Sequence, residues 1–209
     1  MACPGPAFRR RAACAGGSVR VAGARCARWP DRGRGGAGEP GIEKARRYAA
    51  DWLSESGRVV RVLLLDKRPD ANWALGWHQD WTIAELSRQE VDGFGPWTVK
   101  RGIVHVAPPA ALHAKMLTAR LHLDHMDERN GALLIAPGSN RLGRIAEADI
   151  QAVVDRHGVE TCHADAGDVW FYSTPILHAS ARAEAGRRRR VVQIDLAAFD
   201  LPGGLEWSA

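Results

Sequence analysis

The sequence contains few cysteines and no long hydrophobic run. Four cysteines occur in 209 residues. Three of them, Cys3, Cys14 and Cys26, have spacings that match no zinc motif, whose ligand pairs usually lie about two to four residues apart. The fourth, Cys162, is expected to be a small buried hydrophobic residue. No run of about 18 apolar residues and no signal-peptide h-region occur, so we expect no membrane span and a cytoplasmic protein with free thiols.

The body of the chain has no excess of charge of either sign. The formal net charge is +5, but residues 1–40 carry eight arginines against two acidic residues, whereas residues 41–209 carry 21 lysines and arginines against 22 acidic residues. A nucleic-acid-binding domain usually concentrates basic charge on its folded part. We therefore expect no nucleic-acid partner, and a nucleic-acid role for the basic first segment is kept only as an alternative.

The first 40 residues have a narrow composition. Alanine, glycine, arginine and proline account for 29 of them, and such a segment cannot bury enough apolar surface to offset its ordering entropy. The sequence therefore predicts a disordered tail over residues 1–40. Residues 41–209 are expected to form one domain, since their number lies within the range of a single hydrophobic core.

Hydrophobic periodicity predicts mainly β-structure in the body of the chain. Apolar residues at helical spacing predict one helix over 41–57 and another over 145–157, the second capped by Gly158. Short runs of β-forming residues predict strands at 59–65, 81–86, 102–106, 116–124, 132–136, 169–172 and 190–197. Many short strands with few helices favour an antiparallel sandwich or barrel over an alternating α/β fold.

Histidine is the main chemical resource, with eight residues. On a strand, His-X-Asp places an imidazole and a carboxylate on one face, and this pattern occurs at His78-Gln79-Asp80, His122-Leu123-Asp124 and His163-Ala164-Asp165. Together with His178 from a distant strand, such a pair would form the two-histidine, one-carboxylate triad that binds Fe(II) and leaves positions open for a chelating cosubstrate. The pair at His163 lies too close to His178, and spacing alone does not separate the other two.

A run of four arginines, residues 187–190, follows His178. A solvated basic turn is one interpretation of this run. The alternative is that one guanidinium, at the start of the next strand, binds a carboxylate with two hydrogen bonds. Strand alternation places Arg189 on the same face as Gln193, and Arg188 and Arg190 on the opposite face.

Arg120, His122 and Asp124 alternate with apolar residues along the predicted strand at 116–124. One side of this strand is therefore polar, and it either lines a pocket or faces solvent. If it lines a pocket, Arg120 and His122 are candidate contacts for a cosubstrate or a substrate.

Three segments together resemble one protein family. They are residues 72–81 (NWALGWHQDW), 130–140 (NGALLIAPGSN) and 167–180 (GDVWFYSTPILHAS), followed by the arginine run. In combination they are similar to the phytanoyl-CoA dioxygenase family of non-haem iron, 2-oxoglutarate-dependent oxygenases, over roughly residues 59–209. The resemblance implies a double-stranded β-helix, which is a distorted jelly roll, with iron at the mouth of the barrel.

The resemblance also implies roles for individual residues. His78, Asp80 and His178 fall on the family's iron ligands, and Arg189 falls on its 2-oxoglutarate arginine, with Arg188 and Arg190 still open as alternatives. Further cosubstrate contacts are expected from Ser180, Gln79 and Arg120, although strand alternation turns Gln79 away from the ligands. The first 40 residues do not resemble the folded elements that family members have before the iron strand.

The function implied by the resemblance is hydroxylation of a small organic molecule. Fe(II), 2-oxoglutarate and dioxygen are the expected cofactor and cosubstrates, with 2-oxoglutarate converted to succinate and carbon dioxide. Related halogenating enzymes lack the carboxylate ligand, so the presence of Asp80 favours hydroxylation. A degenerate family member that binds metal without turnover and a cupin-type module that binds a small molecule are the alternatives. Neither the substrate nor the oligomeric state can be deduced from the residues.

Overall fold

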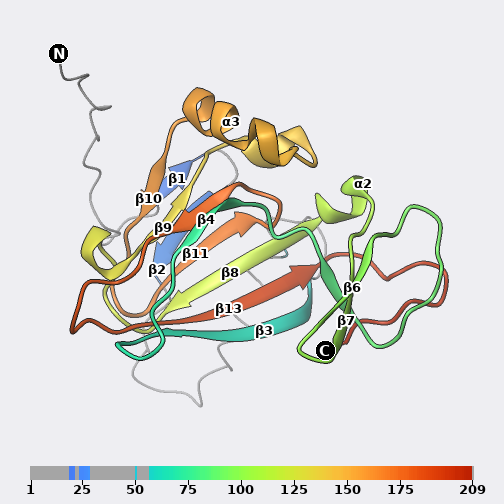
Figure 1. Cartoon of the computed structure of the whole chain (residues 1–209), viewed down its shortest axis with the longest axis horizontal. Coiled ribbons are helices and arrows are strands. Elements are labelled where there is room, and N and C mark those ends of the chain that lie inside the picture. The colour runs from blue at the N-terminus through green and yellow to red at the C-terminus, as the bar shows by residue number, and fades with distance from the viewer. Residues whose placement is uncertain (1–18, 22–23, 29–49, 51–56, 209) are drawn as a thin grey trace.

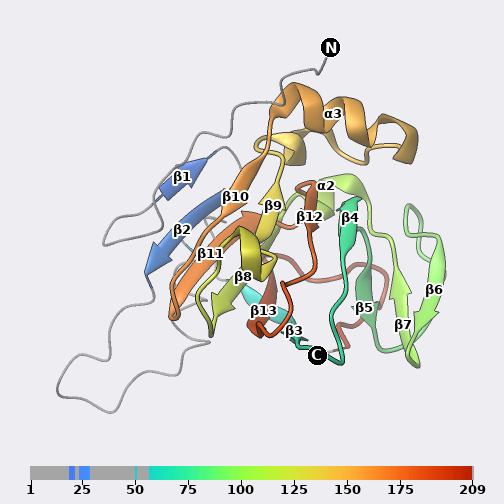
Figure 2. The same cartoon turned by 60° about the vertical axis from the view of Figure 1, so that its left-hand side comes forward.

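The computed structural model describes residues 19–21, 24–28, 50 and 57–208. Two antiparallel β-sheets face each other, and a third, smaller sheet lies at one end (Figures 1 and 2). This arrangement confirms the predicted mainly-β jelly roll with few helices. No helix in these residues is long and apolar enough to cross a membrane.

The largest sheet has six strands. Their order across the sheet is β1 (Val19–Val21), β2 (Ala24–Arg28), β11 (Asp168–Ser173), β8 (Met116–His122), β13 (Arg189–Ala197) and β3 (Arg58–Lys67). The pairing of β8, β13 and β3 is antiparallel throughout. It places Arg120, Gln193 and Leu63 side by side, one row from Thr118, Asp195 and Arg61.

The opposite sheet has four short strands and carries helix α3 on its outer side. The strand order is β10 (Glu160–Cys162), β9 (Leu133–Ile135), β12 (His178–Ser180) and β4 (Leu75–His78). Helix α3 (Ile150–His157) packs Val153 and Val154 against Ala136 and Leu177. This packing covers the sheet next to the segment that leads into β12.

The remaining elements lie at the end of the sandwich or in its connections. The third sheet consists of β5 (Ile83–Glu85), β7 (Ile103–Val106) and β6 (Trp97–Lys100), and the short helix α2 (Ala110–His113) follows it. Three 3₁₀ turns occur in the described residues: η1 (Glu128–Asn130), η2 (Ser139–Leu142) and η3 (Glu147–Asp149). The helix predicted at 145–157 is thus η3 followed by α3, and it ends at Gly158, whose φ of +74° suits glycine.

The structure describes only part of the first 57 residues. Residues 19–21 and 24–28 form β1 and β2, and β2 pairs along β11. The expectation of disorder is therefore wrong for these residues. The edge of β11 offers free backbone donors and acceptors, and a further strand satisfies them. The rest of residues 1–40, and the helix predicted at 41–57 apart from residues 50 and 57, lie outside the described residues.

The space between the two large sheets is divided into an apolar and a polar part. The apolar part is a cluster of buried residues from both sheets and their connections: Ala24, Met126, Ala132, Leu133, Ile135, Cys162, Ala164, Trp170, Tyr172, Ile176 and Val191. Cys162 is fully buried here, as expected. The polar part follows the inner faces of β3, β8 and β13, where buried charged side chains replace apolar ones. Burial of charge is costly unless it serves binding or pairing, so the polar part locates the candidate site.

Candidate metal centre and its pocket

Two histidines and one carboxylate converge between the four-stranded and six-stranded sheets. His78 ends β4 and His178 begins β12, and the two residues are direct partners across the antiparallel ladder. Asp80 follows β4, with its carboxylate oxygens 3.8 Å from Nε2 of His78 and 3.9 Å from Nε2 of His178. One donor atom from each residue lies within 4.8 Å of the other two, and no other such group occurs in the described part of the chain.

Hydrogen bonds orient both imidazoles toward a common point. Nδ1 of His78 lies 2.7 Å from the carbonyl oxygen of Gly76, and Nδ1 of His178 lies 3.0 Å from that of Ile176. Because a carbonyl only accepts, each Nδ1 carries the proton and donates, which leaves each Nε2 lone pair free for a metal. Burial also lowers the pKa of His178 to about 4, so this ring is neutral at physiological pH.

Asp80 is held in its ionised form. Its burial on its own would raise the pKa, but His178, Arg61 and Arg120 outweigh this effect and lower the pKa to about 2. Nη2 of Arg61 lies 3.8 Å from the carboxylate. The three residues therefore offer two imidazole nitrogens and one carboxylate oxygen, which is the donor set of a facial triad for Fe(II). The chemistry of this donor set fits such a metal.

The other two His-X-Asp pairs do not reach this point. His122 is buried in the six-stranded sheet, and neither of its ring nitrogens has a hydrogen-bond partner among the described residues. His163 lies at the surface, where its Nε2 is 2.8 Å from a carboxylate oxygen of Glu128. Of the three pairs, the structure brings only His78 and Asp80 together with His178.

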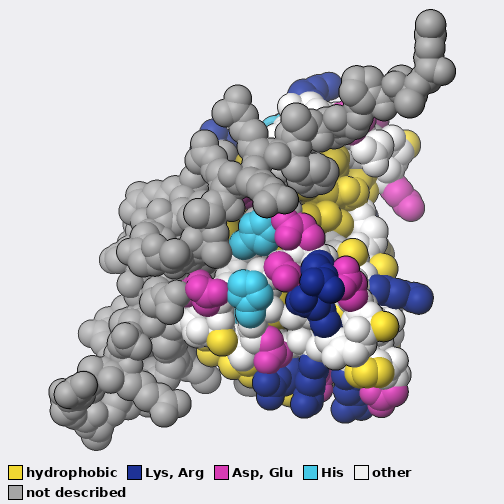
Figure 3. Space-filling model, turned by 90° about the vertical axis from the view of Figure 1, so that its left-hand side faces the viewer, with side chains coloured by type: hydrophobic (Ala, Val, Ile, Leu, Met, Phe, Trp, Pro, Cys, Tyr) yellow, Lys and Arg dark blue, Asp and Glu magenta, His cyan; other side chains and the backbone are white. Residues whose placement is uncertain are grey.

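The arginine run separates as strand alternation predicts. Arg188 binds Asp66 and Arg190 binds Asp124, each with two hydrogen bonds at the surface. Acidic and basic side chains are interspersed on the face of the molecule drawn in Figure 3. Arg189 is instead buried, lines the pocket, and donates from Nη1 to the carbonyl oxygen of Gly131.

Arg189 lies at a basic end of the pocket. Opposite it in the β3–β13 ladder is Lys67, whose Nζ donates to Oγ of Ser180 over 3.1 Å and to the carbonyl oxygen of Ala181 over 2.6 Å. The ammonium group also lies 5.3 Å from the ring centre of Trp73. Burial, together with Arg189 and Arg120, lowers the pKa of Lys67 to about 7. Two cationic groups and a hydroxyl at one end suit a carboxylate.

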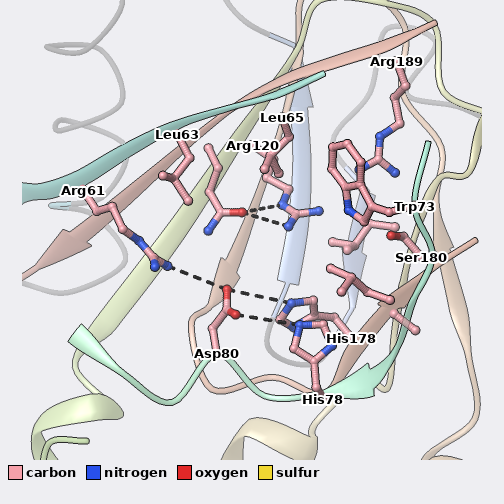
Figure 4. Close-up of a pocket in the computed structure, with 14 residues that line it drawn as sticks. Arg61, Leu63, Leu65, Trp73, His78, Asp80, Arg120, His178, Ser180 and Arg189 are labelled. Carbon is pink, nitrogen blue, oxygen red and sulfur yellow. Dashed lines mark hydrogen bonds and ion pairs between the residues drawn. The ribbon is translucent and has the colours of Figure 1, made fainter. Parts of the chain in front are cut away.

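The pocket that joins this basic end to the metal ligands is drawn in Figure 4, with Arg189 and Ser180 on one side, Arg61 on the other, and Asp80, His78 and His178 below. Arg120 lines it from β8 and donates from Nε and Nη2 to Oε1 of Gln193. The remaining lining is mainly apolar: Leu63, Leu65, Trp73, Leu75, Leu133 and Ala179. The predicted polar face of the strand at 116–124 therefore lines the pocket at Arg120.

Gln79 lies outside the pocket, although the sequence suggested a cosubstrate contact. Its Nε2 donates to the carbonyl oxygens of Gly143 and Pro175, and its Oε1 accepts from the backbone N–H of Ile145. The extended chain that follows β4 turns this side chain away from its neighbours His78 and Asp80. Gln79 instead connects the His78 segment to the turn at Pro175, which leads into His178.

The sequence did not indicate the pocket residues of β3. Arg61, Leu63, Leu65 and Lys67 alternate along this strand, and the first three line the pocket. Their alternation was visible in the sequence. The register of β3 against β13 places this face in the pocket, and the sequence alone does not reveal that register. Trp73 also lines the pocket, and the neighbours that surround it there are equally distant in the sequence.

The fold and site define a jelly-roll protein in which two histidines and one carboxylate that could hold a metal lie in the same pocket as a buried arginine. The family description "Phytanoyl-CoA dioxygenase (PhyH)" matches residues 39–191, and the chain belongs to this family. A comparison with curated proteins gives no match.

Solved structures share the fold at low identity. EctD from S. alaskensis matches with a TM-score of 0.54 and 17% identity over 73% of this chain and 49% of EctD; it has also been solved with Fe and with 2-oxoglutarate and 5-hydroxyectoine. AviO1 from Streptomyces viridochromogenes Tue57 matches with a TM-score of 0.54 and 18% identity, over 88% of this chain and 77% of AviO1. EvdMO1 matches with a TM-score of 0.53 and 20% identity over 79% of this chain. The chain spans 31% of EvdMO1 and about half of EctD.

Proposed function

We propose that this chain is an Fe(II)- and 2-oxoglutarate-dependent oxygenase that hydroxylates a small organic molecule. The proposal rests on one observation: the three donor atoms of His78, Asp80 and His178 lie within 4.8 Å of one another in a pocket whose far end carries Arg189. Membership of the phytanoyl-CoA dioxygenase family supports it. In such a reaction 2-oxoglutarate and dioxygen are converted to succinate and carbon dioxide as the substrate gains a hydroxyl group.

The two ends of the pocket would bind different parts of 2-oxoglutarate. His78, Asp80 and His178 would hold the metal, and bound Fe(II) supplies the activation of dioxygen and the chelation of the 2-oxo acid. The distal carboxylate would bind Arg189 and the hydroxyl of Ser180, with Lys67 as a neighbouring positive charge. Charge-assisted hydrogen bonds of this kind fix both the position and the direction of a dicarboxylate.

The protein also fixes its ligands in place before any metal arrives. The backbone carbonyls of Gly76 and Ile176 hold the two imidazoles, and Gln79 ties the two ligand-bearing segments together. Asp80 occupies the third position with a carboxylate, which leaves no place there for a halide. This feature supports hydroxylation as the reaction of the bound substrate.

An anaerobic titration tests the proposal. Purified protein is loaded with Fe(II) and then with 2-oxoglutarate, and the visible charge-transfer band of the chelate is recorded. We expect the band in the wild type, its loss in His178→Ala, and a cosubstrate requirement raised by about tenfold or more in Arg189→Ala. The matched control is Arg188→Ala, which removes a neighbouring arginine that binds Asp66 at the surface.

The outcomes separate the alternatives. A band together with succinate formation in air supports the oxygenase. A band without succinate formation indicates a family member that binds metal and cosubstrate without turnover. A folded wild type that binds Fe(II) but shows no band and no response to 2-oxoglutarate contradicts the proposal and favours a cupin-type binding module.

A further inference from the structure

Three cationic side chains in and beside the pocket form no hydrogen bond or ion pair with a carboxylate among the described residues, although the charge of Arg120 also acts on Asp80. Lys67 donates to a hydroxyl and a carbonyl, Arg120 donates to the amide oxygen of Gln193, and Arg189 donates to a carbonyl. Every one of these acceptors is uncharged. Arg61, which lines the same pocket, differs because it forms an ion pair with the buried carboxylate of Asp195. The pocket therefore contains more positive charge than the nearby carboxylates of Asp80 and Asp195 can neutralise once Asp80 binds a metal.

A dianionic cosubstrate leaves part of this charge uncompensated. Fe(II) bound to one carboxylate and two neutral imidazoles retains one positive charge, and Lys67, Arg120 and Arg189 add three. 2-Oxoglutarate supplies two negative charges, which is half of what neutrality requires. With Lys67 in its neutral form, an excess of one positive charge still remains. Buried charge without a counter-ion is unfavourable, so the loaded pocket favours a further anion.

Arg120 is the cation best placed to receive that anion. The amide of Gln193 is oriented by its own donation from Nε2 to Asp195 over 3.2 Å, so that its oxygen faces Arg120. Arg120 is therefore held at 3.1 Å and 2.8 Å through Nε and Nη2. Its guanidinium also lies 5.8 Å from the ring centre of Tyr172, which is itself 6.0 Å from the ring of His178. This arrangement fixes a guanidinium near the metal ligands and leaves part of its donor set unused among the described residues.

The surroundings of Arg120 define the rest of the ligand. Leu63 and Leu75 line the pocket and are 37% and 46% exposed, respectively. Leu65 and the ring of Trp73 extend the same lining toward the basic end. An apolar group that covers these side chains would gain burial, whereas a uniformly polar molecule would not. The pocket thus combines one fixed cation with an open apolar wall.

We propose that the substrate is a small carboxylic acid with an apolar body, whose carboxylate binds the guanidinium of Arg120 while its body covers Leu63, Leu65 and Leu75. The inference rests on the proposed function, since 2-oxoglutarate is what occupies the Arg189 end. Arg61 does not anchor the substrate, because Asp195 already neutralises it. The carboxylate of the substrate completes the charge balance of the loaded pocket.

Matched pairs of acids and amides test this assignment. The anaerobic protein with Fe(II) and 2-oxoglutarate is titrated with 3-phenylpropionate or 3-phenylpropionamide, and with hexanoate or hexanamide, and binding is read from the shift of the visible band and from tryptophan fluorescence. We expect each acid to bind about tenfold more tightly than its amide, a difference of about 1.4 kcal/mol. The Arg120→Met variant should bind acid and amide about equally. Arg120→Lys, which keeps the charge, should retain a preference for the acid.

The control variant is Arg141→Met, which removes an exposed arginine of η2 and should keep the wild-type preference. Equal binding of acids and amides by the wild type overturns the substrate assignment, as does an unchanged preference in Arg120→Met. If Arg120→Met does not fold, the acid–amide comparisons in the wild type and in Arg120→Lys still test the substrate assignment. Absence of the Fe(II)–2-oxoglutarate band in the wild type contradicts the proposed function itself. A normal band without preference for acids contradicts the substrate assignment alone.

Discussion

If 2-oxoglutarate binds as proposed, its affinity depends on pH through the titration of Lys67. Its folded-state pKa of about 7 means that the ammonium form predominates below neutrality and is lost above it. We expect the affinity for 2-oxoglutarate to fall by about threefold or more as the pH rises from about 6 to about 8.5, since a cation beside Ser180 is lost. Isothermal titration of the metal-loaded protein measures this. Lys67→Met should bind more weakly and show a flat profile, and a flat profile in the wild type would contradict the assignment. The exposed Lys115→Met is the control.

Gln79 makes hydrogen bonds to backbone groups only, so we expect it to affect metal binding by positioning the ligand-bearing segments. Its amide donates to two carbonyls and accepts from one backbone N–H, so all three bonds are lost in Gln79→Leu. Loss of such supporting bonds typically weakens metal binding by about tenfold, and we expect this in an anaerobic Co(II) titration followed by absorbance. Gln89→Leu removes a surface amide that binds Gly204 and should have no effect. Equal metal affinity in both variants would show that Gln79 does not position the ligands.

At the scale of an element, β5 carries a buried carboxyl group that the proposed reaction does not use. Glu85 is 1% exposed and neither carboxyl oxygen has a hydrogen-bond partner among the described residues. Burial raises its pKa from 4.5 to about 7, although the backbone of Glu206 acts in the opposite direction. The protonated form therefore stabilises the fold fully below about pH 4.5, and this contribution is lost as the pH rises through about 7.

Glu85→Gln should consequently stabilise the protein only at higher pH. We expect a gain of about 1–2 kcal/mol above pH 8, or several degrees in the melting temperature, and little change below about pH 5. Thermal unfolding followed by circular dichroism at several pH values measures it. A gain that is the same at every pH would indicate a packing effect, and no gain at high pH would contradict the raised pKa.

The elements that the sequence predicted correctly are those whose own residues carry a periodic signal. The strands at 59–65, 169–172 and 190–197 correspond to β3, β11 and β13, whose β-branched and aromatic residues mark them. The strands that carry His78 and His178 were not among the predicted strands, because β4 (LGWH) and β12 (HAS) are short and contain no β-branched residue. Ligand chemistry and spacing left more than one His-X-Asp pair open, and the family resemblance selected His78 and Asp80. Lys67 and Arg61 required the cross-strand register of β3.

For the whole molecule, a bound metal is a cross-link between distant parts of the chain. His78 and His178 lie on different strands and are separated by most of the described sequence, so metal binding opposes unfolding of the sandwich. Saturation at about 100 times the dissociation constant contributes about 2.7 kcal/mol, which raises the melting temperature by roughly 7 °C. Anaerobic thermal unfolding with and without Fe(II) measures the shift. It should vanish in His178→Ala and persist in His163→Ala, and an equal shift in both variants would place the metal elsewhere.

The direct pairing of His78 with His178 in the β4–β12 ladder also constrains the evolution of the sequence. Side chains alternate along a strand, so inserting or deleting one residue in either strand would turn a ligand to the opposite face and abolish the centre. The connection between β5 and β6 is mostly exposed and contributes no residue to the pocket, so it is free of this constraint and can vary in length. Heritable length changes can therefore accumulate in that connection and not in the strands that carry the two histidines, which leaves the centre unaltered.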